Sequence, residues 1–157
     1  MILGYVESLL PLFAGVPGIK LGLPNLIVVF LLYTYGGKEA MLVSTVRILI
    51  IGFLFGNLYS IAFSLAGGLC SLAGMRLLKR IPGFSVFGIS VAGGVLHNMG
   101  QLLIASAVVE NFRVFYYFSV LLVSGIITGL MIGFLSAEML KRMSGIFKDN
   151  QRRIEKL

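Results

Sequence analysis

Cysteine is almost absent from this sequence, and so are other residues on which most enzymes depend. Cys70 is the only cysteine, His97 the only histidine and Asp149 the only aspartate in 157 residues. One thiol cannot form an intrachain disulfide or a cysteine-built zinc or iron–sulfur site. The chain also has no Walker lysine loop, no nucleophile elbow and no aspartate-rich motif for magnesium and diphosphate. We therefore expect no catalytic residue, no metal and no cofactor, and an enzyme acting alone is disfavoured.

Charge is scarce as well. Only 12% of the residues are charged while 58% are hydrophobic, and the mean hydropathy is +1.00. This composition indicates a lipid solvent, in which a helix needs about 17–25 apolar residues to cross a hydrocarbon core of roughly 30 Å. We expect an all-α integral membrane protein, with a six-helix transmembrane domain over residues 1–143 and a basic cytoplasmic tail over 144–157. The first basic residue is Lys20, too late for the basic start of a secretory signal.

Glycine and proline divide the apolar sequence into six predicted helices. The helices cover residues 1–16, 24–35, 38–56, 58–75, 84–109 and 114–137, and a Gly/Pro-rich loop lies between the first two. With six crossings, ten basic residues fall on one side and only Lys20 and Arg113 on the other. The positive-inside rule then places both termini in the cytoplasm, with the plasma membrane as the expected location. The clustering of basic residues on the cytoplasmic side accounts for the net charge of +7. Nucleic-acid binding is therefore not expected.

The basic tail leaves two alternatives open. It mixes apolar residues such as Ile146 and Phe147 with charged ones such as Lys148 and Arg152. A helical extension lying on anionic headgroups is the simpler interpretation. Docking to a partner protein is the other.

Small residues recur at four-residue spacing. Gly125, Gly129 and Gly133 do so in the last helix, and Gly68 lies on a small-residue face of the fourth helix. Such faces let helix backbones approach closely in lipid, where no hydrophobic force brings helices together. They indicate either packing inside one bundle or a surface for another membrane subunit.

Arg47 is the clearest intramembrane charge. A charge at the bilayer centre costs at least about 2.5–3.5 kcal/mol and persists when it is paired or faces a cavity. Its expected partner is Glu7, the acidic residue of the first predicted span. Arg47 is therefore predicted to form a structural ion pair with Glu7 or to bind an anion.

A second polar group lies in the middle of the fifth predicted helix, at His97, Asn98 and Gln101. His97 and Gln101 share a helix face at i and i+4, and Asn98 lies on an adjoining one. These side chains either satisfy one another's hydrogen bonds or bind a ligand.

The outward loop over residues 17–25 brings Lys20 and Asn25 to the mouth of the predicted bundle. This position suits contact with an anionic group. We therefore count Lys20, Asn25, Arg47, His97, Asn98 and Gln101 as candidate substrate-binding residues.

Five short segments of this sequence, taken in order, match a pattern found in a known protein family. They are residues 5–11, residues 17–25, Gly37-Lys38-Glu39-Ala40 followed by Arg47, residues 64–68, and His97-Asn98-Met99-Gly100-Gln101. Over almost the whole chain this pattern resembles the Gx transporter family, which is also labelled heptaprenyl diphosphate synthase component I. That family in turn resembles the substrate-binding S components of energy-coupling factor transporters.

The resemblance implies a six-helix subunit that binds a vitamin-like, quinone-precursor-like or isoprenoid-like molecule and is powered by a coupling subunit and ATPases. It also implies that the 17–25 loop acts as a lid and that His97, Asn98 and Gln101 face the ligand, between that loop and the last three helices. The first helix is short for the family, which suggests an alternative start. Under the other family label, the chain would be a membrane accessory subunit of a prenyl-diphosphate synthase. A partner of quinone- or flavin-linked electron transfer is a third possibility.

Overall fold

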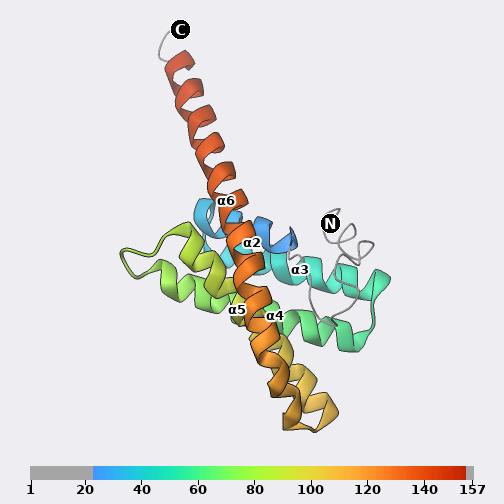
Figure 1. Cartoon of the computed structure of the whole chain (residues 1–157). Coiled ribbons are helices and arrows are strands. Elements are labelled where there is room, and N and C mark those ends of the chain that lie inside the picture. The colour runs from blue at the N-terminus through green and yellow to red at the C-terminus, as the bar shows by residue number, and fades with distance from the viewer. Residues whose placement is uncertain (1–22, 155–157) are drawn as a thin grey trace.

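The computed structural model describes residues 23–154, and over that range it is helical without strands. The helices are α2 (Leu23–Thr34), α3 (Gly37–Phe55), α4 (Leu58–Lys79), α5 (Val86–Val109), the 3-10 helix η1 (Phe112–Tyr117) and α6 (Phe118–Ile154). Figure 1 shows α6 as a long straight rod that runs at a steep angle to α3 and α4. The predicted first helix, the 17–22 part of the loop, Glu7 and Lys20 lie outside the described residues.

Short polar signals set the helix boundaries. Gly36, with φ of +121°, makes the turn between α2 and α3, a backbone conformation that favours glycine. The Asn57 side chain accepts a 2.8 Å hydrogen bond from the Ser60 N–H and caps α4, and Ser85 caps α5 in the same way from Gly88. These boundaries agree with the predicted helices to within a few residues, except that α4 continues to Lys79 and α6 to Ile154.

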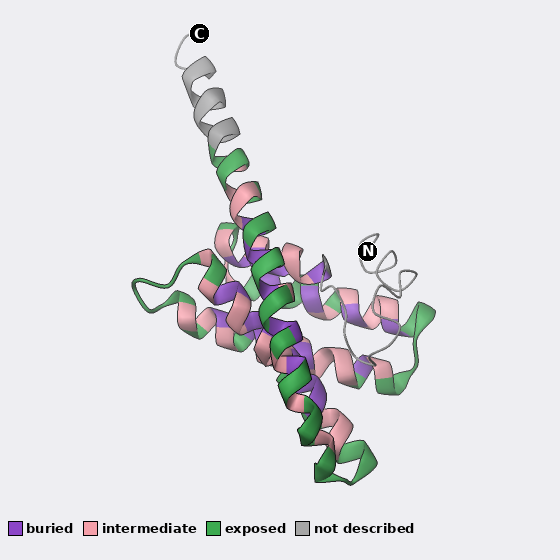
Figure 2. Ribbon diagram, viewed as in Figure 1, coloured by how far each residue is buried: buried purple, intermediate pink, exposed green. Residues whose placement is uncertain are grey.

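Three helices have the length and apolar composition to cross a membrane: Leu58–Lys79, Val86–Val109 and Phe112–Ser144. Helix α2 has only 12 residues, and α3 carries Lys38, Glu39 and Arg47 within its 19 residues. The all-helical prediction is confirmed, whereas six crossings stay a prediction. Figure 2 shows exposed residues along the outer faces and buried ones where the helices meet.

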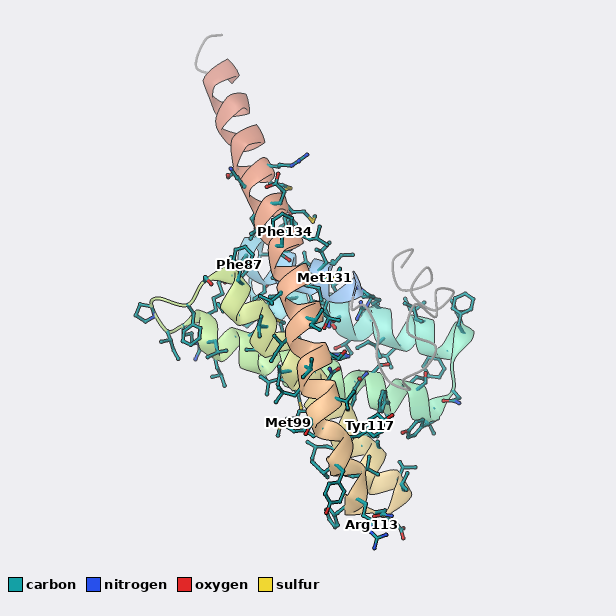
Figure 3. The ribbon with its side chains drawn as sticks, in the orientation of Figure 1. Phe87, Met99, Arg113, Tyr117, Met131 and Phe134 are labelled. Atoms are coloured by element: carbon teal, nitrogen blue, oxygen red, sulfur yellow. The ribbon has the colours of Figure 1, made fainter. Side chains whose placement is uncertain are left out.

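The core draws on every described α helix. Val29 and Leu32 of α2, Leu72 of α4, Ile89 of α5 and Ile132 of α6 are all buried in one cluster. Large exposed apolar side chains cover the outside, including Phe87, Met99, Met131 and Phe134 in Figure 3. A water-soluble protein rarely exposes so continuous an apolar surface, whereas lipid solvates it.

Glycines bring α5 and α6 into backbone contact. A Cβ added to Gly129 would lie 2.6 Å from Val91 Cα, and one added to Gly125 would lie 3.0 Å from the Gly94 carbonyl. A Cβ on Gly133 would lie 3.1 Å from Phe87 Cα. The stripe of small residues on α6 thus packs against α5, and any larger side chain there would push the two helices apart.

Candidate functional site

A pocket lies between α2 and α3. Its volume is about 340 Å³, within the usual range for small-molecule sites. Apolar side chains form most of its wall, and Ser44 and Arg47 are its polar lining residues. The lining residues are Pro24, Ile27, Val28, Leu42, Val43, Ser44, Val46, Arg47 and Ile50.

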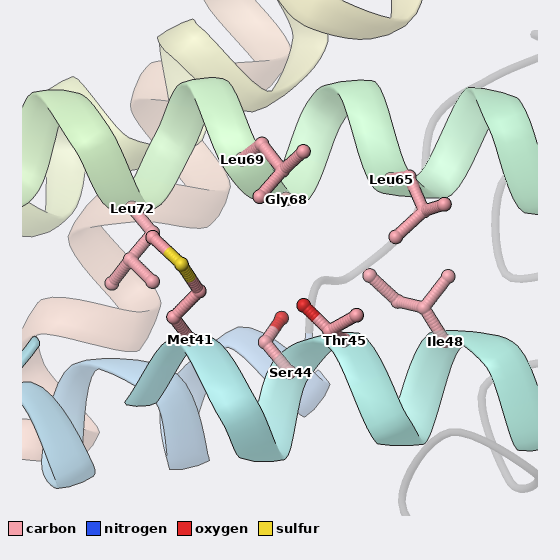
Figure 4. Close-up of a pocket in the computed structure, with 8 residues that line it drawn as sticks. All are labelled: Met41, Ser44, Thr45, Ile48, Leu65, Gly68, Leu69 and Leu72. Carbon is pink, nitrogen blue, oxygen red and sulfur yellow. The ribbon is translucent and has the colours of Figure 1, made fainter. Parts of the chain in front are cut away.

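Arg47 is half-buried, and its Nε and Nη1 atoms are shielded from solvent. It lies ten residues beyond Gly37, the first residue of α3, which is about 15 Å along the helix axis. Ser44, one turn earlier, also belongs to this wall, but it is buried and its hydroxyl points toward Gly68 of α4 on the other side of α3 (Figure 4). The pocket wall thus combines one positive charge with apolar side chains, a composition that suits a partly apolar, anionic molecule.

The corner between α2 and α3 is held by the basic end of α4. Lys79 Nζ donates a 2.6 Å hydrogen bond to the Leu32 carbonyl and lies 4.8 Å from the centre of the Tyr33 ring. Arg76, one turn earlier, packs against Gly37, where an added Cβ would lie 2.8 Å from Arg76 Cδ. A cation at the carboxyl end of a helix also interacts favourably with the helix dipole. Lys79 and Arg76 therefore position the two helices that form the pocket wall.

A crevice between α3 and α4 lies on the other side of α3. In Figure 4 the side chains of Met41, Ser44 and Ile48 point toward Leu65, Leu69 and Leu72 of α4, with Gly68 between them. The crevice has no room for a water molecule. Gly68 thus faces α3, and this contact is a helix packing surface.

The polar residues of α5 lie on two different neighbours. A Cβ on Gly67 of α4 would lie 2.8 Å from Gln101 Cγ and 2.9 Å from His97 Cε1, so these two side chains lie against α4. Asn98 instead donates a 2.7 Å hydrogen bond from Nδ2 to the Leu121 carbonyl of α6. The structure therefore places His97 and Gln101 at the contact between α5 and α4, and Asn98 at the contact between α5 and α6.

Of the other predicted site residues, Asn25 lies in the first turn of α2 and is half-buried, so it belongs to the helix and not to the loop. The predicted ion pair between Glu7 and Arg47 and the role of Lys20 lie outside the described residues and stay predictions. Sequence reasoning missed Lys79, and no local signal in the sequence pointed to its contact with α2.

No group of three or more His, Cys, Asp or Glu side chains that could hold a metal ion occurs within residues 23–154. The ion pair between Arg142 Nε and Glu138 Oε1, 2.7 Å apart, is exposed and lies within one helix. Such exposed pairs stabilise a helix only slightly.

Over residues 23–154 these features define an all-helical protein with three apolar helices long enough to cross a membrane and a pocket lined in part by an arginine. The family model described as heptaprenyl diphosphate synthase component I matches residues 1–139, so the chain belongs to that family. This confirms the family predicted from the sequence, whereas the likeness to S components stays a prediction. No curated protein and no solved structure matches the chain.

Proposed function

We propose that the chain is a membrane-embedded substrate-binding subunit. It binds a small, partly apolar and anionic molecule between α2 and α3 and passes it to a partner. The observation that carries this proposal is Arg47 in the wall of an otherwise largely apolar pocket of about 340 Å³. An arginine within an apolar helix is costly in lipid unless it is paired or faces a cavity, and the α2–α3 pocket is such a cavity.

The proposal includes six crossings in the plasma membrane, with both termini in the cytoplasm. The contact of Lys79 with Leu32 and of Arg76 with Gly37 supports it, because these contacts bring the basic end of α4 beside the α2–α3 corner, which carries Lys38. Arg113 lies at the opposite end from the projecting part of α6, as Figure 3 shows. Along η1 and α6, Arg113 is thus far from Lys141 and Arg142, a separation that the positive-inside rule would favour if this segment crosses the membrane.

We further propose that the chain is not catalytic by itself. The sequence has one aspartate, in the tail, and lacks the motifs of nucleotide hydrolysis and prenyl transfer. A partner must therefore supply the energy or the chemistry. If the chain is part of a transporter, the partners are a coupling membrane subunit and ATPases. The transported substrate is then a small vitamin-like, quinone-precursor-like or isoprenoid-like molecule.

The family description favours a second candidate function. A heptaprenyl diphosphate synthase component I implies a partner subunit that carries the catalytic residues. The pocket would then bring a membrane-dissolved prenyl substrate or product to that partner. Both candidates use the same pocket and differ in the partner.

Affinity purification of the tagged full chain at its natural expression level separates the two candidates. Copurification of ATPase subunits with a coupling membrane protein supports transport. Copurification of a prenyltransferase supports the accessory role. If neither class is retained, even after chemical cross-linking in membranes, both partner assignments are wrong.

A further inference from the structure

Four basic residues gather at the corner between α2 and α3 and form what we call the basic corner. They come from the end of α4 and from the first turn of α3: Arg76, Lys79, Arg80 and Lys38. The Arg76 side chain reaches across to α3, because a Cβ added to Gly37 would lie 3.0 Å from Arg76 Nε. The Lys79 side chain reaches across to α2, where its Nζ bonds the Leu32 carbonyl. Three helices therefore meet around these charges.

Aromatic residues indicate that the basic corner lies at a membrane surface. Lys79 Nζ lies 4.8 Å from the centre of the Tyr33 ring, and Tyr35, two residues further on, is 69% exposed. Tyrosine, lysine and arginine are the residues typical of the place where a helix leaves the hydrocarbon layer. Helix α4 has the length and apolar composition to cross that layer, and it ends at this corner. A crossing α4 would bring the headgroups of one leaflet beside the basic corner.

The positive charge of this corner is only partly balanced by its own acidic residue. Glu39 lies in the first turn of α3, and a Cβ added to Gly36 would lie 3.1 Å from Glu39 Oε2. The carboxylate therefore lies over the turn between α2 and α3. Four basic side chains and one carboxylate leave a net charge of +3 at the corner, which favours an anionic ligand.

We infer that the basic corner binds the headgroup of an anionic phospholipid. Arg76 and Lys79, whose side chains already lie at the corner, contact the phosphate, and the exposed Lys38 and Arg80 add electrostatic attraction. Basic pockets between membrane helices bind anionic headgroups in this way. None of these four residues lines the α2–α3 pocket, so the inference does not depend on the proposed function.

The test titrates the detergent-purified full chain with three probes and measures bound lipid by native mass spectrometry. The probes are phosphatidylglycerol, the zwitterionic phosphatidylcholine and the water-soluble glycerol 3-phosphate. One basic residue near an anionic surface contributes about fivefold in binding. We expect phosphatidylglycerol to bind at least about tenfold more tightly than either of the other two probes.

Two matched double variants locate the binding. Lys38→Gln with Arg80→Gln removes two exposed charges from the corner and should weaken phosphatidylglycerol binding by about tenfold or more. Lys141→Gln with Arg142→Gln removes the same charge from exposed positions on α6 and should change binding by less than about threefold.

Glu39→Gln should have the opposite effect and strengthen phosphatidylglycerol binding by about threefold to fivefold, because it removes the negative charge beside the headgroup. Such a gain cannot result from a loss of folding. Arg76→Gln should remove the preference for phosphatidylglycerol over phosphatidylcholine. If that variant fails to fold, Glu39→Gln and the Lys38 and Arg80 double variant still test the inference.

The inference is wrong if phosphatidylcholine binds as tightly as phosphatidylglycerol, or if glycerol 3-phosphate binds as tightly as the lipid, which would indicate a soluble anion. Equal losses in the two double variants would also overturn it, because they would indicate diffuse attraction. Ile27→Trp, which fills the α2–α3 pocket, should leave phosphatidylglycerol binding unchanged. If Ile27→Trp removes this lipid, the lipid is bound in the pocket and not at the basic corner.

Discussion

Lys79 Nζ donates a 2.6 Å hydrogen bond to the Leu32 carbonyl, which joins the last turn of α4 to the last turn of α2. The two residues are 47 positions apart. Leu32 belongs to the helix whose first turns, at Pro24 and Ile27, form one wall of the pocket. The bond therefore connects the basic end of the molecule to the geometry of the candidate site.

Replacing Lys79 with Met should loosen this connection. We expect a loss of about 1–2 kcal/mol in stability, since a charged hydrogen bond is removed but the lysine is exposed. Faster hydrogen exchange at the end of α2, measured by mass spectrometry, checks the prediction. Arg80→Met, at the adjacent exposed position, serves as the control. Equal exchange in both variants would contradict the role of Lys79.

The contact between α5 and α6 predicts opposite effects for two glycines. Gly129→Ala should destabilise the protein by about 1–3 kcal/mol, because the new Cβ would lie 2.6 Å from the Val91 backbone. Gly88→Ala should be neutral or stabilising by up to about 1 kcal/mol, because its Cβ would meet nothing closer than 3.6 Å and alanine favours helix. Thermal unfolding in detergent measures both, and a more stable Gly129→Ala protein would rule out the backbone contact.

Asn98 and Gln101 should separate in their effects. Asn98→Ala removes the hydrogen bond to Leu121 and should cost about 0.6–2 kcal/mol, with ligand affinity unchanged. Gln101→Ala tests the prediction that Gln101 contacts the ligand, which requires weaker binding with the fold intact. Met99→Ala, on the exposed side of the same helix, is the control for both. If the Asn98→Ala protein is as stable as the wild type but binds the ligand more weakly, Asn98 contacts the ligand and is not a packing residue.

Much of the fold could be predicted because local chemistry determines it. Gly36 and Gly37 end one apolar run, Asn57 caps the next, and Pro82 with Gly83 forces a turn, so helix ends follow from sequence. The sequence did not predict that α4 continues to Lys79. That last turn contacts α2, and the contact depends on which helices become neighbours.

The candidate site could be predicted only in part. Arg47 was identifiable because a charge in an apolar run is costly wherever it lies. The wall opposite Arg47 was not, since hydropathy does not show that Pro24 and Ile27 face α3. Asn98 and Gln101 were grouped by spacing, yet one contacts α6 and the other α4. Spacing fixes the helix face but not the neighbour it meets.

The six-crossing arrangement predicts which loops face the cytoplasm. In a Cys70→Ala background, single cysteines placed at Lys38, Gly83 and Ser144 should react with a membrane-impermeant maleimide only from the cytoplasmic side. Cysteines at Asn57 and Asn111 should react only from outside, because the basic residues cluster away from them. Labelling of intact cells and of inverted vesicles measures this. Reaction of Gly83→Cys and Asn111→Cys from the same side would exclude the arrangement.

Native mass spectrometry of the detergent-purified protein tests the central claim most directly. The account predicts that the wild-type chain retains one small anionic molecule. Ile27→Trp, which fills the α2–α3 pocket, should release that molecule, while the matched Val120→Trp should keep it. If the wild-type chain carries no ligand even after incubation with membrane extract, or if Ile27→Trp retains the ligand fully, the pocket beside Arg47 is not a substrate site.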